Sequence, residues 1–169
     1  MRFPLRALLL LTLLPLTPAL ADSPSREMRI LGWVEWVRLM PEDLRIKAKL
    51  DTGATTSSLN ALNQEIFERD GEDWIAFDLL DPEDEDRHIR LEREITRYVR
   101  IVRHSGDHQR RPVVEVDLCL GGVHRREEVS LVDRTELTYQ LLVGRNHMEG
   151  AILVDPGETF MGEARCPSP

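Results

Sequence analysis

The sequence is poor in the residues that build disulfide or metal scaffolds. Only two of its 169 residues are cysteines, Cys119 and Cys166, which is too few for a disulfide framework. There is no His-Glu-x-x-His motif, no cysteine pair at zinc-ligand spacing and no phosphate-binding Gly-Lys loop. The two cysteines could form one bridge that fixes the C-terminal tail, or one could be a buried thiol and the other an exposed one.

Basic residues are also scarce. The chain has 22 lysines and arginines against 30 aspartates and glutamates, which gives a formal net charge of −8 at pH 7. A surface of this sign repels the phosphates of nucleic acids and of anionic lipids. We therefore expect neither nucleic acid nor an anionic membrane surface among the partners.

Outside residues 1–21 the sequence has no long apolar run. Arg2 and Arg6 precede the apolar run Leu8–Leu16, and Ala19–Ala21 is a small-residue cleavage pattern, so this segment is typical of a signal peptide. The run is too short to cross a bilayer as a stable helix. An uncleaved membrane anchor is the alternative, and in both cases we expect the working domain outside the cytoplasm.

The remaining residues, 22–169, are sufficient for one domain with a hydrophobic core. Removal of the signal peptide takes two arginines away and brings the formal charge to about −10. We expect an exported, periplasmic protein that has no stable membrane insertion once the signal is removed.

One stretch organises the rest of the chain. Residues 46–50 alternate between apolar and lysine side chains, as in a strand with one buried face. The alternation stops at Asp51, which is followed by Thr52, Gly53 and further small or hydroxylated residues. A carboxylate in such a loop is costly to bury unless it is hydrogen-bonded or shares a proton with a neighbour. The stretch therefore indicates a functional acid, with an ordinary turn as the alternative.

Short strands separated by turn residues are predicted through most of the chain, as in a small closed β-barrel. Ile30–Leu39 and the strand after it form a predicted hairpin around Pro41–Asp43, and Gly121–Gly122 is a second hairpin signal. One helix is predicted at Asn60–Arg69. The other predicted strands are Trp74–Leu79, His88–Glu92, Ile95–Arg103, Val113–Leu120, Arg126–Val132 and Ala151–Pro156.

Two motifs resemble those of the retropepsin-like aspartic peptidases. Asp-Thr-Gly-Ala at residues 51–54 resembles the catalytic loop of that family, and Leu141–Asn146 resembles the apolar-apolar-Gly-Arg-Asn segment after its last core strand. With Gly32–Glu35 upstream, residues 31–155 look like a bacterial branch that is often labelled as ATP-dependent zinc proteases. The resemblance implies an all-β fold, a small closed barrel of the acid-protease type with one or two short helices.

The resemblance further implies an aspartic endopeptidase that works as a homodimer. The sequence has one Asp-Thr-Gly, whereas peptide hydrolysis of this type uses two carboxylates that share one proton. Asp51 from each chain would supply the pair, with Thr52 bracing the loops, Gly53 permitting close approach and Ala54 contacting a peptide or protein substrate. No cofactor is implied. A catalytically inactive, dimeric peptide-binding module of the same fold is the alternative.

The resemblance also places the mobile flap of retropepsins near residues 88–112. Its turn would lie at His104–His108, although the interval between the two motifs is longer than in compact viral enzymes. Five arginines stand out here on an acidic protein, at positions 97, 100, 103, 110 and 111. Arg100 and Arg103 are candidates for binding the carboxylates of an acidic peptide, and a charge-balanced strand surface is the alternative.

No metal site is assigned. The five histidines are scattered, and Gly106 between His104 and His108 favours a turn. A zinc site assembled in space, and with it a zinc-dependent peptidase, is the less favoured alternative. The acidic segment Asp81–Asp86 lacks the ligand spacing and the glycine of a calcium loop, which favours a solvated turn.

Overall fold

The computed structural model describes residues 27–84, 86–102 and 108–166, so the predicted signal peptide lies outside the described residues. Ten strands in this part of the chain form one sheet, in the order β10-β1-β2-β9-β3-β8-β7-β6-β5-β4. One short helix, α1 (Arg145–Met148), accompanies them. The all-β prediction with a short helix is therefore confirmed. Within the described ranges, no helix is long and apolar enough to span a membrane.

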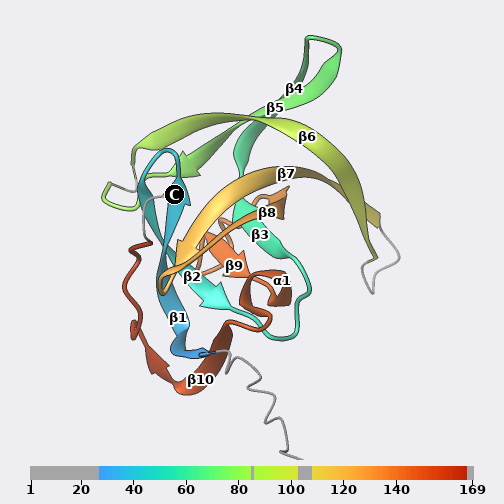
Figure 1. Ribbon diagram of the computed structural model, residues 1–169. Coiled ribbons are helices and arrows are strands. Elements are labelled where there is room, and N and C mark those ends of the chain that lie inside the picture. The colour runs from blue at the N-terminus through green and yellow to red at the C-terminus, as the bar shows by residue number, and fades with distance from the viewer. Residues whose placement is uncertain (1–26, 85, 103–107, 167–169) are drawn as a thin grey trace, which may run out of the picture.

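Six of the strands close into a barrel (Figure 1). In order round the barrel they are β1 (Arg29–Met40), β2 (Leu44–Leu50), β9 (Leu141–Val143), β3 (Ser57–Asn60), β8 (Val123–Val132) and β7 (His108–Leu120). The barrel closes because β7 pairs antiparallel with the end of β1, from Val37 opposite Leu120 to Met40 opposite Asp117. Apolar side chains from all six strands fill its interior. This is the small closed barrel that the sequence predicts.

Both predicted hairpins of the barrel are present. β1 and β2 pair antiparallel across the turn at residues 41–43, and β7 and β8 pair across Gly121–Gly122. The two glycines have φ angles of 55° and 80°, in the left-handed region that a glycine enters without steric cost. The turn residues therefore set the register of two barrel strands.

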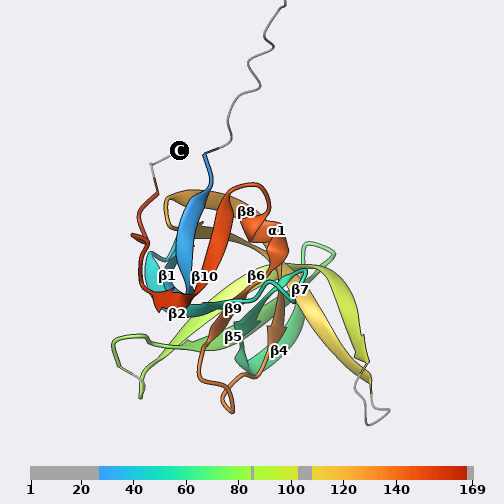
Figure 2. The ribbon, with the colours of Figure 1, turned by 90° about the horizontal axis from the view of Figure 1, so that it is seen from below.

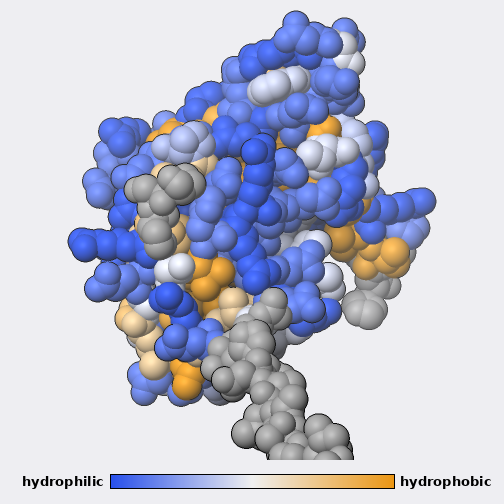
Figure 3. Space-filling model, in the orientation of Figure 1, coloured by the Kyte–Doolittle hydropathy of each residue, from blue (hydrophilic) through white to orange (hydrophobic). Residues whose placement is uncertain are grey.

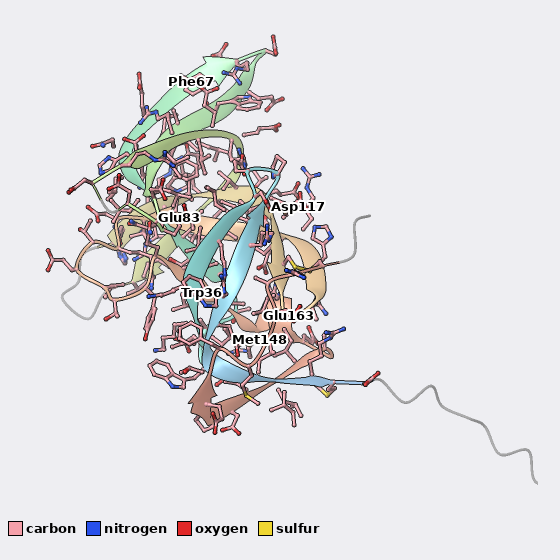
Figure 4. All side chains as sticks on the ribbon, turned by 90° about the vertical axis from the view of Figure 1, so that its left-hand side faces the viewer. Trp36, Phe67, Glu83, Asp117, Met148 and Glu163 are labelled. Carbon is pink, nitrogen blue, oxygen red and sulfur yellow. A yellow bond between two sulfur atoms is a disulfide. The ribbon has the colours of Figure 1, made fainter. Side chains whose placement is uncertain are left out.

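The predicted helix at Asn60–Arg69 is wrong. This segment forms β4 (Leu62–Arg69), which pairs antiparallel with β5 (Glu72–Leu80), the strand predicted at Trp74–Leu79. Asp70 and Gly71 between them both have positive φ, 55° and 87°, as in the two-residue turns that favour hairpins. Most side chains of β4 are exposed, so the segment has no apolar alternation that would show it to be a strand. The hairpin projects from the barrel: Figure 4 shows Phe67 on it, at the end of the molecule opposite Met148.

A second hairpin leaves the barrel between β6 (His88–Val102) and β7. The sequence predicts two strands in the β6 region, and the structure has a single strand with an irregularity between Ile95 and Arg97. The outer part of this hairpin pairs from Tyr98 opposite Pro112 to Val102 opposite His108 and projects to one side (Figure 2). The predicted turn, residues 104–107, lies outside the described residues, as does Arg103.

The C-terminal segment is tied to the outside of the barrel. β10 (Ile152–Thr159), predicted at Ala151–Pro156, pairs parallel with β1 at the edge of the sheet. The chain then continues along β1, where the buried Glu35 carboxylate accepts hydrogen bonds from the backbone N–H groups of Met161 (2.8 Å) and Gly162 (3.1 Å). A disulfide joins Cys119 of β7 to Cys166. Of the alternatives that the sequence left for the cysteines, the bridge is the one present.

Candidate active site

The candidate site is the loop that begins where β2 ends. The Asp51 N–H donates to the Val143 carbonyl of β9 (2.9 Å), which anchors the loop to the barrel. The N–H of Gly53 donates to Oδ1 of Asp51 over 2.9 Å, and the N–H of Ala54 donates to the Asp51 carbonyl over 3.2 Å. These bonds fix one carboxylate oxygen of Asp51 within a tight turn. The sequence predicted both the strand end and the loop.

The other carboxylate oxygen of Asp51, Oδ2, accepts no hydrogen bond from the described residues. Oδ2 lies 3.7 Å from Nζ of Lys49, and the Asp51 side chain is 29% exposed. Thr52 and Gly53 are exposed beside it. None of the hydrogen bonds and ion pairs of this carboxylate within the described ranges involves a second acidic side chain. The Asp51 carboxylate is therefore partly exposed and has no second acid among its described partners.

Helix α1 clamps the loop from behind. Arg145 donates from Nη1 to the Thr52 carbonyl and from Nη2 to Oγ1 of Thr55, both over 2.8 Å. The backbone N–H groups of Arg145 and Asn146 donate to the carbonyls of Ala54 (2.9 Å) and Thr55 (3.0 Å). The second motif recognised in the sequence is therefore the support of the first.

Gly144, between β9 and α1, permits this close approach. A β-carbon at this position would lie 2.6 Å from the carbonyl carbon of Thr56 and 2.7 Å from the carbonyl oxygen of Thr55. Both are backbone atoms, which cannot move aside as the end of a side chain can. A glycine is therefore required here by space alone.

A buried polar network lies next to the loop, and no sequence pattern predicted it. Oγ of Ser57 donates to Oε1 of Glu127 over 3.1 Å and accepts from the N–H of Gly144 over 3.1 Å. Nδ1 of His147 lies 3.0 Å from the same Glu127 oxygen, and the His147 side chain is fully buried. The network joins β3, β8 and α1 beneath Asp51. Ser57, Glu127 and His147 lie outside the recognised motifs and on three separate elements, so only the fold brings them together.

Of the five arginines singled out in the sequence, the four that the structure describes make different contacts. Arg97 is bidentate on Glu128 of β8, and Arg110 stacks on the ring of Tyr98 at 3.5 Å. Arg111 donates to the side chain of Gln109. Arg100 is exposed on the outer part of β6 and makes no ion pair within the described ranges. The ion pair with Glu128 makes Arg97 part of a charge-balanced strand surface, which was the alternative interpretation. The substrate-binding role of Arg100 and Arg103 stays a prediction.

In the described part of the chain, no group of three or more metal-ligating side chains comes together. His88, His124 and His147 each lie beside one carboxylate, of Asp78, Asp117 and Glu127 respectively. In the acidic segment, Asp81 is buried and is paired with Arg87. The N–H of Glu83 donates to Asp81 over 2.8 Å and, together with Arg87, lowers the pKa of the Asp81 carboxyl. This carboxylate therefore stabilises the turn.

A groove with a volume of about 530 Å³ lies beside the loop. It runs from Thr52 and Thr55 past α1 to the edge strand β10. Its floor includes Met148 and Leu153, and Leu153 is 51% exposed. The face seen in Figure 3 is mostly hydrophilic, with only small apolar patches. The groove therefore joins the Asp51 loop to a partly apolar sheet edge.

Comparison with known proteins identifies relatives of this fold and loop. A family model described as "RimB-like: Retropepsin-like aspartic endopeptidase RimB" matches residues 30–164. The chain is 36% identical over 138 residues to a "Probable alpha-L-glutamate ligase" of Shewanella pealeana, covering 79% of this chain and 30% of that protein. It is 37% identical over 140 residues to a protein of the same name from Parasynechococcus marenigrum, covering 80% and 30%.

The chain thus spans about 30% of the length of the curated relatives it matches. It is also similar to the crystal structure of a Legionella pneumophila protein of unknown function, with a TM-score of 0.66 and 33% sequence identity. That similarity covers 78% of this chain and 96% of the other. The likeness therefore extends over almost the whole of that solved structure.

Proposed function

Because the chain belongs to the RimB-like family of retropepsin-like aspartic endopeptidases, we propose that it is an aspartic endopeptidase whose active site forms between two copies of the chain. Each copy contributes Asp51. One carboxylate of the pair removes a proton from a water molecule, and the other donates a proton to the oxygen of the scissile carbonyl. Two acids at contact distance share one proton because both cannot ionise together.

The observation that carries this proposal is the presentation of Asp51. Its loop is held by β9 and α1, yet the Asp51 side chain is 29% exposed and Thr52 and Gly53 are exposed. A two-fold axis at this loop would bring two Asp51 carboxylates together and cover the exposed residues of both loops. The groove along β10 would extend the contact, since Leu153 and Ile30 expose 51% and 58% of their surface at the same edge.

The β6–β7 hairpin supports the binding of an extended peptide. It leaves the barrel as a two-stranded ribbon, the form of a flap that closes over a substrate and excludes water. In this proposal Ala54 contacts the peptide beside Asp51, and Arg100 and Arg103 contact it from the hairpin. A peptide bound in this way needs no cofactor.

The relatives suggest which peptides to test first. Those that carry the name probable alpha-L-glutamate ligase match this chain over about 30% of their length, and a ligase of that name joins glutamate residues. We therefore propose glutamate-containing peptides as substrates. Export to the periplasm is also proposed, and the Cys119–Cys166 disulfide supports it, because such bonds persist in oxidising compartments.

The direct test compares wild-type protein with Asp51→Asn on a peptide library at several pH values. Hydrolysis should be lost in this variant and kept in the matched control Asp70→Asn, which changes an exposed acid of the β4–β5 turn. After subunit exchange, an equal mixture of wild-type and Asp51→Asn chains should have about one quarter of the activity of the same total amount of wild-type protein if each site needs both acids. It should have about one half if each chain works alone. Peptide binding without any hydrolysis would instead favour the binding module.

A further inference from the structure

Arg134 is a buried cation without a carboxylate partner in the described part of the chain. It follows β8 and is only 8% exposed. Its Nε donates to the Tyr139 carbonyl over 3.0 Å, and its Nη1 donates to Oγ of Ser58 over 3.3 Å. Both acceptors are neutral, and Nη2 donates to no described residue. Burial of the guanidinium, with the charge of Arg111 nearby, lowers the pKa of Arg134.

A buried charge normally has a counter-ion, since desolvation of an unpaired ion is costly. Arginine is moreover the residue that best recognises a carboxylate, because its planar fork donates two parallel hydrogen bonds. The two neutral bonds of Arg134 fix the orientation of the fork and leave part of it unused. The arrangement is therefore suited to an anion that arrives with a ligand.

Strand register places this guanidinium on the same face of the barrel as Asp51. Ser58 of β3 lies opposite Leu142 of β9, and Leu142 lies opposite Lys49 of β2. Directly opposed residues point to the same side of a sheet, and Lys49 reaches the Asp51 carboxylate. Two strand spacings, about 10 Å in all, therefore separate the hydroxyl that holds Arg134 from the lysine beside Asp51.

The β6–β7 hairpin adds a second cation to this face. Ser58 lies opposite Ser130 of β8, which lies opposite Val113 of β7. Arg111 is two residues from Val113 along β7, so its side chain leaves the strand on the same face. Arg111 is half-buried, whereas its neighbour Arg110, whose side chain leaves the strand on the opposite face, is exposed. The proposed flap thus carries positive charge toward Arg134.

We propose that Arg134 is a specificity-determining residue that binds the carboxylate of an acidic side chain in the peptide substrate, with Arg111 contributing to the positive potential of that subsite. This inference rests on the proposed function and assigns its substrate preference to a residue. An extended peptide advances about 3.3 Å per residue, so the recognised acid lies within about three residues of the scissile bond. The subsite belongs to a single chain, whereas the catalytic pair needs two.

The test uses pairs of peptides that differ only by glutamate or glutamine at each position around the cleaved bond. For wild-type protein, kcat/KM should favour glutamate by about tenfold or more at one position, as a charge-assisted bidentate pair predicts. Arg134→Gln should bring this ratio close to one while cleavage of the glutamine peptide changes by less than about threefold. Arg134→Lys should keep an intermediate ratio, because the charge remains and the fork is lost.

Arg126→Gln is the matched control, since it removes an exposed arginine of β8 that pairs with Glu115. It should leave the ratio unchanged. Equal loss on both peptides in Arg134→Gln, or a wild-type ratio of one at every position, would overturn the inference. If Arg134→Gln does not fold, the ratio measured for Arg134→Lys decides in its place.

The outcome for this subsite is separable from the outcome for catalysis. Binding of the same peptide pairs to the Asp51→Asn variant, measured by fluorescence anisotropy, does not depend on hydrolysis. A preference for glutamate that is lost in Asp51→Asn/Arg134→Gln supports the subsite even if wild-type protein cleaves no peptide. Equal binding of both peptides to Asp51→Asn contradicts it even if wild-type protein is an active peptidase.

Discussion

The guanidinium of Arg145 donates a hydrogen bond of 2.8 Å to the carbonyl oxygen of Thr52, 93 positions earlier in the chain. The bond fixes the backbone of the Asp51 loop at the residue that follows the acid. Together with the bond to Oγ1 of Thr55, it makes the loop a rigid part of the barrel. A dimer that joins two such loops would therefore not have to order them on association.

The first prediction concerns this clamp. Arg145→Lys keeps the charge but cannot donate to both Thr52 and Thr55, so the loop should loosen and peptide cleavage should fall by about tenfold or more. The melting temperature should change little, because Arg145 is at the surface. Arg126→Lys, an exposed arginine of β8, is the control and should retain full activity. Wild-type activity in Arg145→Lys would show that the clamp is dispensable.

The second prediction concerns the buried network under the loop. Glu127→Ala removes the carboxylate oxygen that Ser57 and His147 share, so a buried hydroxyl and a buried imidazole each lose a hydrogen bond. The free energy of unfolding should fall by about 3 kcal/mol or more, measured by urea denaturation. Glu115→Ala removes an exposed glutamate of β7 and should cost less than about 0.5 kcal/mol. Equal effects of the two substitutions would contradict a structural role for the network.

The third prediction concerns pH. Hydrogen bonds from Arg97 hold the pKa of the Glu128 carboxyl below its ordinary value, although partial burial acts in the opposite direction. The ion pair therefore stabilises the fold fully above the ordinary pKa of a glutamate, about 4.3, and this stabilisation is lost as the pH falls through the lower pKa of the folded state. Both side chains are more than a third exposed, so the contribution should stay below about 1 kcal/mol.

Unfolding of wild-type protein and Glu128→Gln at a series of pH values measures this contribution. The difference between them should be largest at neutral pH and should disappear in acid. In the Arg97→Gln background, Glu128→Gln should have little further effect, because the pair is already broken. A difference that grows as the pH falls would have the wrong sign for this mechanism.

The fourth prediction concerns the tail. The Cys119–Cys166 disulfide spans 47 positions, and removing a bond of this span by the double variant Cys119→Ser/Cys166→Ser should cost about 2–4 kcal/mol. A reducing agent should lower the stability of wild-type protein by a similar amount and leave the double variant unchanged. Thermal unfolding with and without the reductant checks both expectations. Insensitivity of wild-type protein to reduction would contradict the bond.

Local features of the sequence were sufficient for much of the barrel and for the Asp51 loop. The alternation of residues 46–50 places Asp51 at a strand end, and Gly121–Gly122 sets a hairpin, because both depend only on neighbouring residues. The prediction of a helix at Asn60–Arg69 is wrong because it, too, used only neighbouring residues. β4 is exposed on most of its length and becomes a strand through its pairing with β5, which no local pattern reveals.

The amino-acid pattern alone was enough to infer an acid on a glycine-containing loop after a buried strand, and a Gly-Arg-Asn segment after the last core strand. The folded chain was needed to show that Arg145 holds that loop and that Glu127 and His147 meet next to it. It was also needed to place Arg134 on the same face of the barrel as Asp51. These contacts join strands that are distant in the chain. They depend on the register in which the barrel closes, and that register is set by packing across all six strands rather than by any single segment.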